Sequence, residues 1–184
     1  MPTILVISGS PSASSKTAAL VEQLADRLGG QDHRVRTIAV RSLPAEALLA
    51  ADATNPRIAE VVRAIAEADG LVVASPVYKA AYTGVLKALL DLLPQFAFAG
   101  KVVLPLLTGG SPAHVLALDY ALRPVLNSLG AHHIVQGYFV LDKLIERTES
   151  GIALAEEAER NLLSIVDTFS TAVHRRRGEL LAAS

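Results

Sequence analysis

Apolar runs rich in β-branched residues alternate along this chain with segments whose apolar positions recur at helical spacing. The runs predict five strands, over residues 3–8, 35–40, 71–75, 102–107 and 134–140. The third run is apolar without a break, which is typical of a strand buried on both faces. The fourth run contains Pro105, so we expect an irregular end or a local edge there.

The segments between the runs predict helices from residue 56 onward and over residues 15–28, 84–93, 113–129 and 152–173. Asn55 followed by Pro56 has the pattern of an N-cap with proline at the first helical position. The residues around Pro44 are expected to form a loop.

Strands that alternate with helices predict an α/β fold, in which helices cover both faces of a parallel sheet. Five strands fit a flavodoxin-like three-layer sandwich with the strand order 2-1-3-4-5. Because the chain has 184 residues, of which 51% are hydrophobic, we expect residues 1–184 to form one domain. Ligands of such sheets lie beyond the carboxyl ends of strands one and three, so the loops after strands one, three and four are the candidates for a site.

Charge and composition exclude several classes of partner and site. The formal net charge of -1 gives no electrostatic footprint for nucleic acid or an anionic membrane, and the basic run 174–177 is expected to be the solvated end of the last helix. We find no signal peptide and no apolar run as long as a membrane span, so we expect a cytoplasmic protein. Cysteine is absent, which excludes disulfides and thiolate ligands, and we expect no metal site.

The loop after the first strand, residues 9–17, opens a predicted helix and is rich in hydroxyl groups. The amides and the positive dipole end of a helix N-terminus favour a phosphate. The residues that would add donors or charge are Ser10, Ser12, Ser14, Ser15, Lys16 and Thr17. Neither the P-loop spacing nor the dinucleotide glycine pattern is present. The alternative interpretation is an ordinary serine-rich N-cap.

The other two loops predict a place for a flat heteroaromatic ring. Residues 76–79, Pro76, Val77, Tyr78 and Lys79, would line one side of the ring. Thr108, Gly109 and Gly110 would allow close backbone approach from the other side. Taken singly, Tyr78 could be a packing residue and the glycines an ordinary turn. One phosphate and one flat ring together indicate a mononucleotide such as FMN.

The predicted helix over residues 113–129 has apolar residues at helical spacing but also contains a proline, which disfavours a regular helix. Pro124 has no N–H, so the carbonyl of Tyr120 loses its usual partner four residues later. We therefore expect a kink or one wide turn around Tyr120. His114 is expected to be a polar rim or interface residue rather than a proton donor.

Four stretches of the chain closely resemble the NADPH-dependent FMN reductases of alkanesulfonate utilisation, the SsuE family. They are residues 68–82, 86–94, 100–105 and 119–126. The resemblance extends to about residue 138. It implies a flavodoxin-like reductase that binds FMN, takes hydride from NADPH and releases reduced flavin to a separate monooxygenase that liberates sulfite from sulfonates. Such proteins are made when sulfur is scarce, which gives a reason for a chain without cysteine and with Met1 as its one methionine.

The resemblance also implies a role for Tyr120 in flavin transfer, in a π-helix at a homo-oligomer (dimer or tetramer) interface. Ser12 stands where the family usually has an arginine, and Lys16 holds a later basic position. Lysine cannot make the bidentate phosphate contact that arginine makes. Two alternatives use the same loops: a quinone or azo reductase that retains its flavin, and a flavodoxin-type electron carrier. Carriers are usually strongly acidic, unlike this chain.

Overall fold

The computed structural model of the protein describes residues 1–149 and 151–182. Its main sheet has the order β2-β1-β3-β5-β6, and all neighbours along this path are parallel. The strands of the path are β1 (Thr3–Ser8), β2 (Arg34–Ala39), β3 (Gly70–Tyr78), β5 (Val102–Gly109) and β6 (His133–Ile134). Two further strands complete this sheet: β4 (Ala81–Tyr82) is antiparallel to β3, and β7 (Tyr138–Leu141) is parallel to β5. The predicted flavodoxin-like order is confirmed, but the sheet has seven strands where we expected five, because β4 is added and the run over residues 134–140 is divided between β6 and β7.

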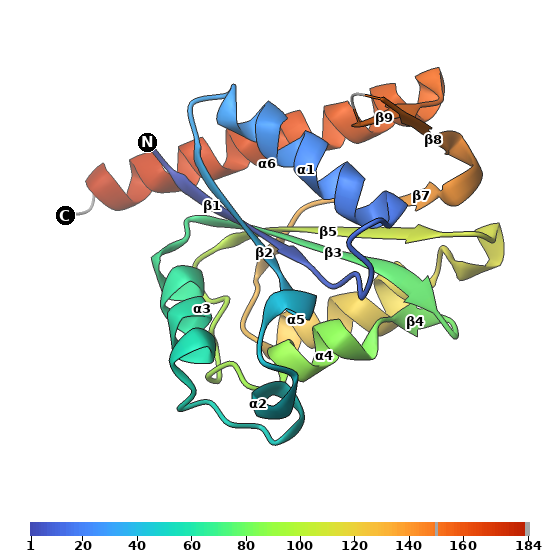
Figure 1. Cartoon of the computed structure of the whole chain (residues 1–184). Helices are drawn as coiled ribbons and strands as arrows, with labels where there is room; N and C mark the ends of the chain where they lie inside the picture. The colour runs from blue at the N-terminus through green and yellow to red at the C-terminus, as the bar shows by residue number, and fades with distance from the viewer. Residues whose placement is uncertain (150, 183–184) are drawn as a thin grey trace.

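Helices form the two outer layers (Figure 1). The helices α1 (Lys16–Gly29) and α6 (Glu156–Ala182) cover one face of the sheet. The other face carries α2 (Ala45–Leu49), α3 (Pro56–Glu67), α4 (Gly84–Leu90) and α5 (Arg123–Ser128). Short 3-10 turns at Val40–Ser42, Pro112–His114 and Asp142–Leu144 join some of these elements.

The core is divided into two clusters by the sheet, and alternate side chains of a strand enter opposite clusters. In β3, Leu71 and Val73 pack toward α3 and α4, whereas Val72 and Ala74 pack toward α1 and α6. A strand covered on both faces needs apolar residues at successive positions. This explains why the third run of the sequence is apolar without alternation.

Pro105 lies inside β5 and is accommodated by a break in the neighbouring strand. β5 pairs with β6 through Val102 and Val103 and with β7 from Leu106 to Gly109. Pro105 lies between these two paired segments and has no partner residue in either β6 or β7. Because proline has no N–H, it can donate no bond there. A Cβ on Gly137 would lie 2.7 Å from the Pro105 carbonyl oxygen, so the connecting segment also requires glycine. Of the two alternatives expected at Pro105, the local edge is confirmed, because β5 continues through the proline beside a gap in the neighbouring strand.

Two further segments do not form the elements that we expected. The segment after Pro44 forms the short helix α2, where we expected a loop. Residues 152–154 belong to an antiparallel hairpin of β8 (Ile145–Thr148) and β9 (Gly151–Leu154), and the last helix begins only at Glu156. Three acidic residues in the first turn of α6 favour this start, since they face the positive end of the helix dipole.

A buried histidine joins the turn before β2 to α6 and makes stability depend on pH. His33 is 2% exposed, its Nε2 lies 2.7 Å from Ser170 Oγ, and its ring centroid lies 4.3 Å from that of His174. Burial and the charge of His174 lower the pKa of His33, while Asp32 and Asp69 act weakly in the opposite sense. The folded protein therefore holds His33 neutral at a pH where the unfolded chain begins to bind a proton.

We expect the free energy of unfolding to fall as the pH drops below about 6.5, the ordinary pKa of histidine. Above that pH, the contribution of His33 is fully present. Urea denaturation at a series of pH values measures this dependence. The variant His33→Gln should show a shallower fall than the wild type. Parallel pH profiles for the two proteins would contradict the assignment.

Candidate active site

Three loops meet at the carboxyl edge of the sheet, opposite the N-terminus and the end of α6 (Figure 1). They are the loop from β1 into α1, the β3–β4 hairpin and the loop after β5. The strand register places Ser8 beside Ala74 and Pro76 beside Thr108. The structure therefore brings the sequence-predicted site residues to one edge of the sheet.

The first loop ends at a well-formed helix cap. Ser15 is the N-cap of α1, and its Oγ accepts a hydrogen bond of 3.0 Å from the amide of Ala18. Ser10 is buried, with its Oγ 2.6 Å from Ser15 Oγ and 3.3 Å from the amide nitrogen of Ser12. Ser12 and Ser14 are exposed. The loop thus offers hydroxyl groups and a helix start to a ligand at the surface.

Lys16 and Thr17 connect the first loop to the other side of the site. The Lys16 ammonium donates to the carbonyl oxygen of Asp142 over 2.5 Å. The buried Thr17 Oγ1 lies 2.6 Å from Thr108 Oγ1, so these two hydroxyls join the first and third loops. Thr17 and Thr108 therefore fix the loops from beneath rather than present their side chains to solvent.

A buried threonine that the sequence analysis missed joins the first and second loops. Thr83 Oγ1 donates to the carbonyl of Gly9 over 2.6 Å and accepts from the amide of Leu86 at 3.2 Å as the N-cap of α4. Ser75 Oγ accepts from the amide of Thr83 at 3.0 Å. A threonine before the helical run that starts at Gly84 is the signal that could have revealed this cap.

The β3–β4 turn is strained and half of its predicted lining is buried. Lys79 and Ala80 have φ angles of 53° and 64°, a region that non-glycine residues seldom adopt and that is enriched at functional sites. Tyr78 is 54% exposed and Lys79 is exposed. Pro76 and Val77 are buried, so their side chains support the site from behind instead of lining it.

The third loop contains a glycine that is required by packing. A Cβ on Gly109 would lie 2.9 Å from Phe139 Cζ and 3.5 Å from Val77 Cβ. Gly110 follows at the surface. The absence of a side chain at Gly109 lets β5 approach its neighbours closely at the point where the strand enters the site.

Beside these loops the chain forms the irregular turn that Pro124 predicts. Residues Leu118–Leu122 are a π-helix, and α5 follows from Arg123. Tyr120 lies in this turn and is 80% exposed. His114 is half-buried, and its Nδ1 has no hydrogen-bond partner among the described residues. The expectation of one wide turn around Tyr120 is confirmed.

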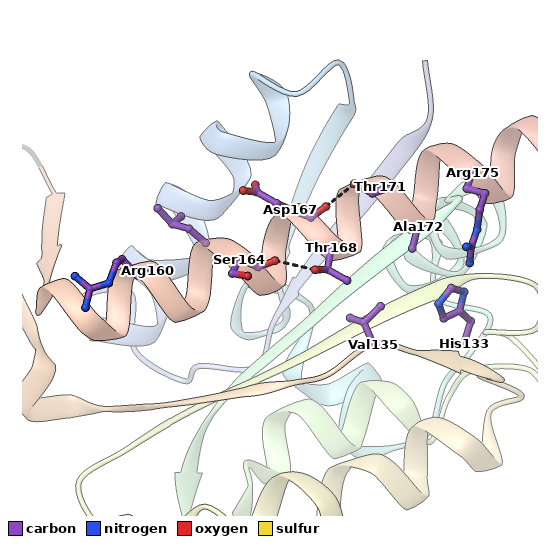
Figure 2. Close-up of a pocket in the computed structure, with 10 residues that line it drawn as sticks. His133, Val135, Arg160, Ser164, Asp167, Thr168, Thr171, Ala172 and Arg175 are labelled. Atoms are coloured by element: carbon purple, nitrogen blue, oxygen red, sulfur yellow. Dashed lines mark hydrogen bonds between the residues drawn. The ribbon is translucent and has the colours of Figure 1, made fainter.

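A pocket of about 880 Å³ lies elsewhere, between α6 and the edge of the sheet at β6. Figure 2 shows Arg160 and Arg175 at its two ends, with His133 and Val135 opposite the helix. None of the residues that line it belongs to the three loops. Its Asp167 carboxylate is held by Arg27 at 2.8 Å. The volume of this pocket is therefore no reason to place the active site there instead of at the three loops.

Comparison with known proteins decides the family. Residues 2–145 match the NADPH-dependent FMN reductase family. The chain belongs to this family. It is 43% identical to the FMN reductase (NADPH) of Pseudomonas putida KT2440 over 175 residues, which are 94% of this chain and 89% of that protein. Its identity to the FMN reductase (NADPH) of Escherichia coli K12 is 42% over 94% of this chain and 91% of that one.

A solved structure of a relative agrees with this membership. The apo form of an NADH:FMN oxidoreductase (EMOB) matches with a TM-score of 0.86 and 47% identity, covering 94% of this chain and 90% of that chain. The described part of the present reductase contains no helix able to cross a membrane. Within the same residues, no group of three His, Asp or Glu side chains is placed to hold a metal ion.

The three loops of this reductase bring amides, hydroxyls and one exposed aromatic side chain to the same edge of the sheet. The capped start of α1 offers amides and hydroxyls to a phosphate, with the hydroxyl of Ser10 fixed at its base. The exposed Tyr78 and the side-chain-free backbone at Gly110 lie at the ends of the adjacent strands β3 and β5. Burial raises the pKa of the nearby Tyr82, so its hydroxyl stays protonated.

Proposed function

We propose that this protein oxidises NADPH, reduces FMN and supplies the reduced FMN to a partner monooxygenase. The observation that carries the proposal is the Ser15-capped start of α1 at the switch point of the sheet, beside the ends of β3 and β5. The residues assigned to the FMN phosphate are Ser10, Ser12, Ser15 and Lys16, and those assigned to the ring are Tyr78, Lys79 and Gly110. The buried Thr17, Pro76, Val77, Thr108 and Gly109, which we expected to contact FMN, are proposed to support these residues from within the protein.

The protein contributes position and a fixed polar environment. Flavin, when bound, supplies the hydride chemistry itself. The hydrogen bonds of Thr83 to Gly9 and of Thr17 to Thr108 hold the three loops in one arrangement before ligand arrives. A preorganised site loses little entropy on binding, which favours a productive approach of the nicotinamide to the flavin.

The proposed physiological role is sulfonate desulfonation under sulfur limitation, in the cytoplasm. Two observations support it: the resemblance to the reductases of alkanesulfonate utilisation, and a chain with no cysteine and one methionine. A protein made when sulfur is scarce benefits from such a composition. In the presence of an alkanesulfonate and O2, addition of a sulfonate monooxygenase should couple NADPH oxidation to sulfite release.

Steady-state oxidation of NADPH and NADH, with FMN, FAD or riboflavin as acceptor, tests the activity. We expect NADPH-driven reduction of added FMN and loss of flavin on desalting. Retention of FMN through desalting, with rapid reduction of quinones or azo dyes, would instead favour an enzyme that keeps its flavin. Retention without NADPH oxidation would favour an electron carrier.

Tyr120 is proposed to act in flavin transfer at an interface between copies of this chain. It is 80% exposed, and Val115 and Leu116, just before the π-helix, are 48% and 58% exposed, so residues 115–120 present exposed apolar side chains. An exposed apolar patch beside a site is typical of a protein interface. A homo-oligomer, dimer or tetramer, would cover it.

We expect Tyr120→Ala to weaken the oligomer and to slow flavin release, so that the variant retains flavin or turns over more slowly. Light scattering and steady-state turnover measure the two effects. Leu49→Ala is the matched control, because Leu49 is 84% exposed on α2. If Tyr120→Ala has the same mass in solution and the same turnover as the wild type, the proposed role of Tyr120 is wrong.

A further inference from the structure

Apart from its first residue, Ile145, the β8–β9 hairpin lies beyond residues 2–145, the part of the chain that matches the family. It packs on the layer of α1 and α6 (Figure 1) through an apolar face. Ile145 is 2% exposed and Ile152 is 9% exposed. Arg147 is the cross-strand partner of Ile152 and lies two residues after Ile145, so it shares that inward face. The side chain of Arg147 is itself exposed, so it extends from the edge of this face.

The guanidinium of Arg147 reaches the first loop of the site. Its Nη2 donates to the carbonyl oxygen of Ser14, the residue before the helix cap Ser15. Lys16 is bound to Asp142, just before the same hairpin. The segment from Asp142 to Arg147 is therefore tied twice to the start of α1, at positions more than 120 residues away in the sequence.

The first loop has little cationic charge of its own. Lys16 is the only basic residue in positions 9–17, and its ammonium is engaged by a carbonyl. A guanidinium has five N–H donors in a planar fork, and one bond to Ser14 leaves most of them available. Bonds from a guanidinium to a phosphate are shorter and stronger than those to a neutral carbonyl. Glu146 falls on the opposite face of β8 by strand alternation.

We propose that Arg147 binds the 5′-phosphate of FMN and makes the site prefer FMN to riboflavin. This inference rests on the proposed function, since it uses the same phosphate position. FMN is favoured over the 2′-phosphate of NADPH because Ser14 directly precedes Ser15, the cap at which the FMN phosphate is placed. Arg147 is exposed on a separate hairpin, so the contact can form and break during turnover.

The test is the ratio of FMN to riboflavin affinity, measured by quenching of flavin fluorescence in the wild type and in variants. We expect Arg147→Gln to raise the Kd for FMN about tenfold and leave the Kd for riboflavin unchanged. The Kd of Arg147→Lys for FMN should lie between those of the wild type and Arg147→Gln, because lysine keeps the positive charge but lacks the planar set of N–H donors. Arg63→Gln, an exposed arginine of α3 on the other face of the sheet, should match the wild type.

Each other outcome contradicts a different statement. If the wild type binds riboflavin as tightly as FMN, the phosphate site itself is wrong, whatever Arg147 does. A wild type that prefers FMN, with the full preference kept in Arg147→Gln, overturns the role of Arg147 alone. A change confined to the ratio of NADPH to NADH affinity assigns the guanidinium to the nicotinamide dinucleotide and also overturns it. Since the ratio is taken within one variant, partial unfolding cancels from it.

Discussion

Ser15→Asp is expected to raise the Kd for FMN at least about a hundredfold without lowering the melting temperature. Ser15 Oγ already accepts a hydrogen bond from the amide of Ala18 as the cap of α1. Aspartate caps a helix as well as serine does and its charge favours the helix N-terminus, so folding should not suffer. The same carboxylate would stand beside the proposed phosphate. Two like charges about 4 Å apart repel by about 4 kcal/mol near a protein surface.

Two controls isolate the charge. Ser15→Asn keeps a good cap without a carboxylate, so its FMN affinity should remain close to that of the wild type. Riboflavin has no phosphate, so its affinity should be the same in all three proteins. Calorimetric titration gives the Kd values, and thermal unfolding gives the stability. An FMN affinity in Ser15→Asp equal to that of the wild type would show that the phosphate lies elsewhere.

Thr83→Val is expected to lower the free energy of unfolding by about 2–4 kcal/mol and to weaken FMN binding. The two side chains have nearly the same shape, so the loss comes from hydrogen bonds and not from a cavity. Thr83 is 2% exposed, and without its Oγ1 the Gly9 carbonyl and the Leu86 amide lose their partner. Because the first loop is anchored by the Gly9 carbonyl, its position beside α4 should loosen as well.

Urea denaturation measures the loss of stability in Thr83→Val, and flavin titration under native conditions measures the loss of affinity. Thr83→Ser keeps the hydroxyl and loses only a methyl group, so it should recover most of both quantities. A Thr83→Val protein as stable as the wild type would show that the bond to Gly9 contributes little.

The centre of the sheet could be predicted from the sequence because β1, β3 and β5 are buried on both faces and read as nearly continuous apolar runs. The β8–β9 hairpin could not be predicted in this way. Ile152 and Leu154 are two apolar residues that fit a helical stripe as well as a strand, and only the packing of the hairpin beside α1 decides between them. The five residues of α2 are likewise too few to show a period.

The parts of the site that depend on local sequence could be predicted. The Ser15 cap precedes its helix directly, and the π-helix at Tyr120 follows from a proline four residues later. The bonds that join the loops could not, because they connect residues distant in the chain, such as Thr17 with Thr108 and Thr83 with Gly9. Periodicity carries no information on such pairs.

A crystal structure of the protein with FMN tests the central claim most directly. We expect the phosphate within hydrogen-bond distance of the amides and hydroxyls of residues 10–17, with the isoalloxazine between the β3–β4 hairpin and the loop after β5. Density for FMN in the pocket between α6 and β6, or with its phosphate away from the start of α1, would contradict it.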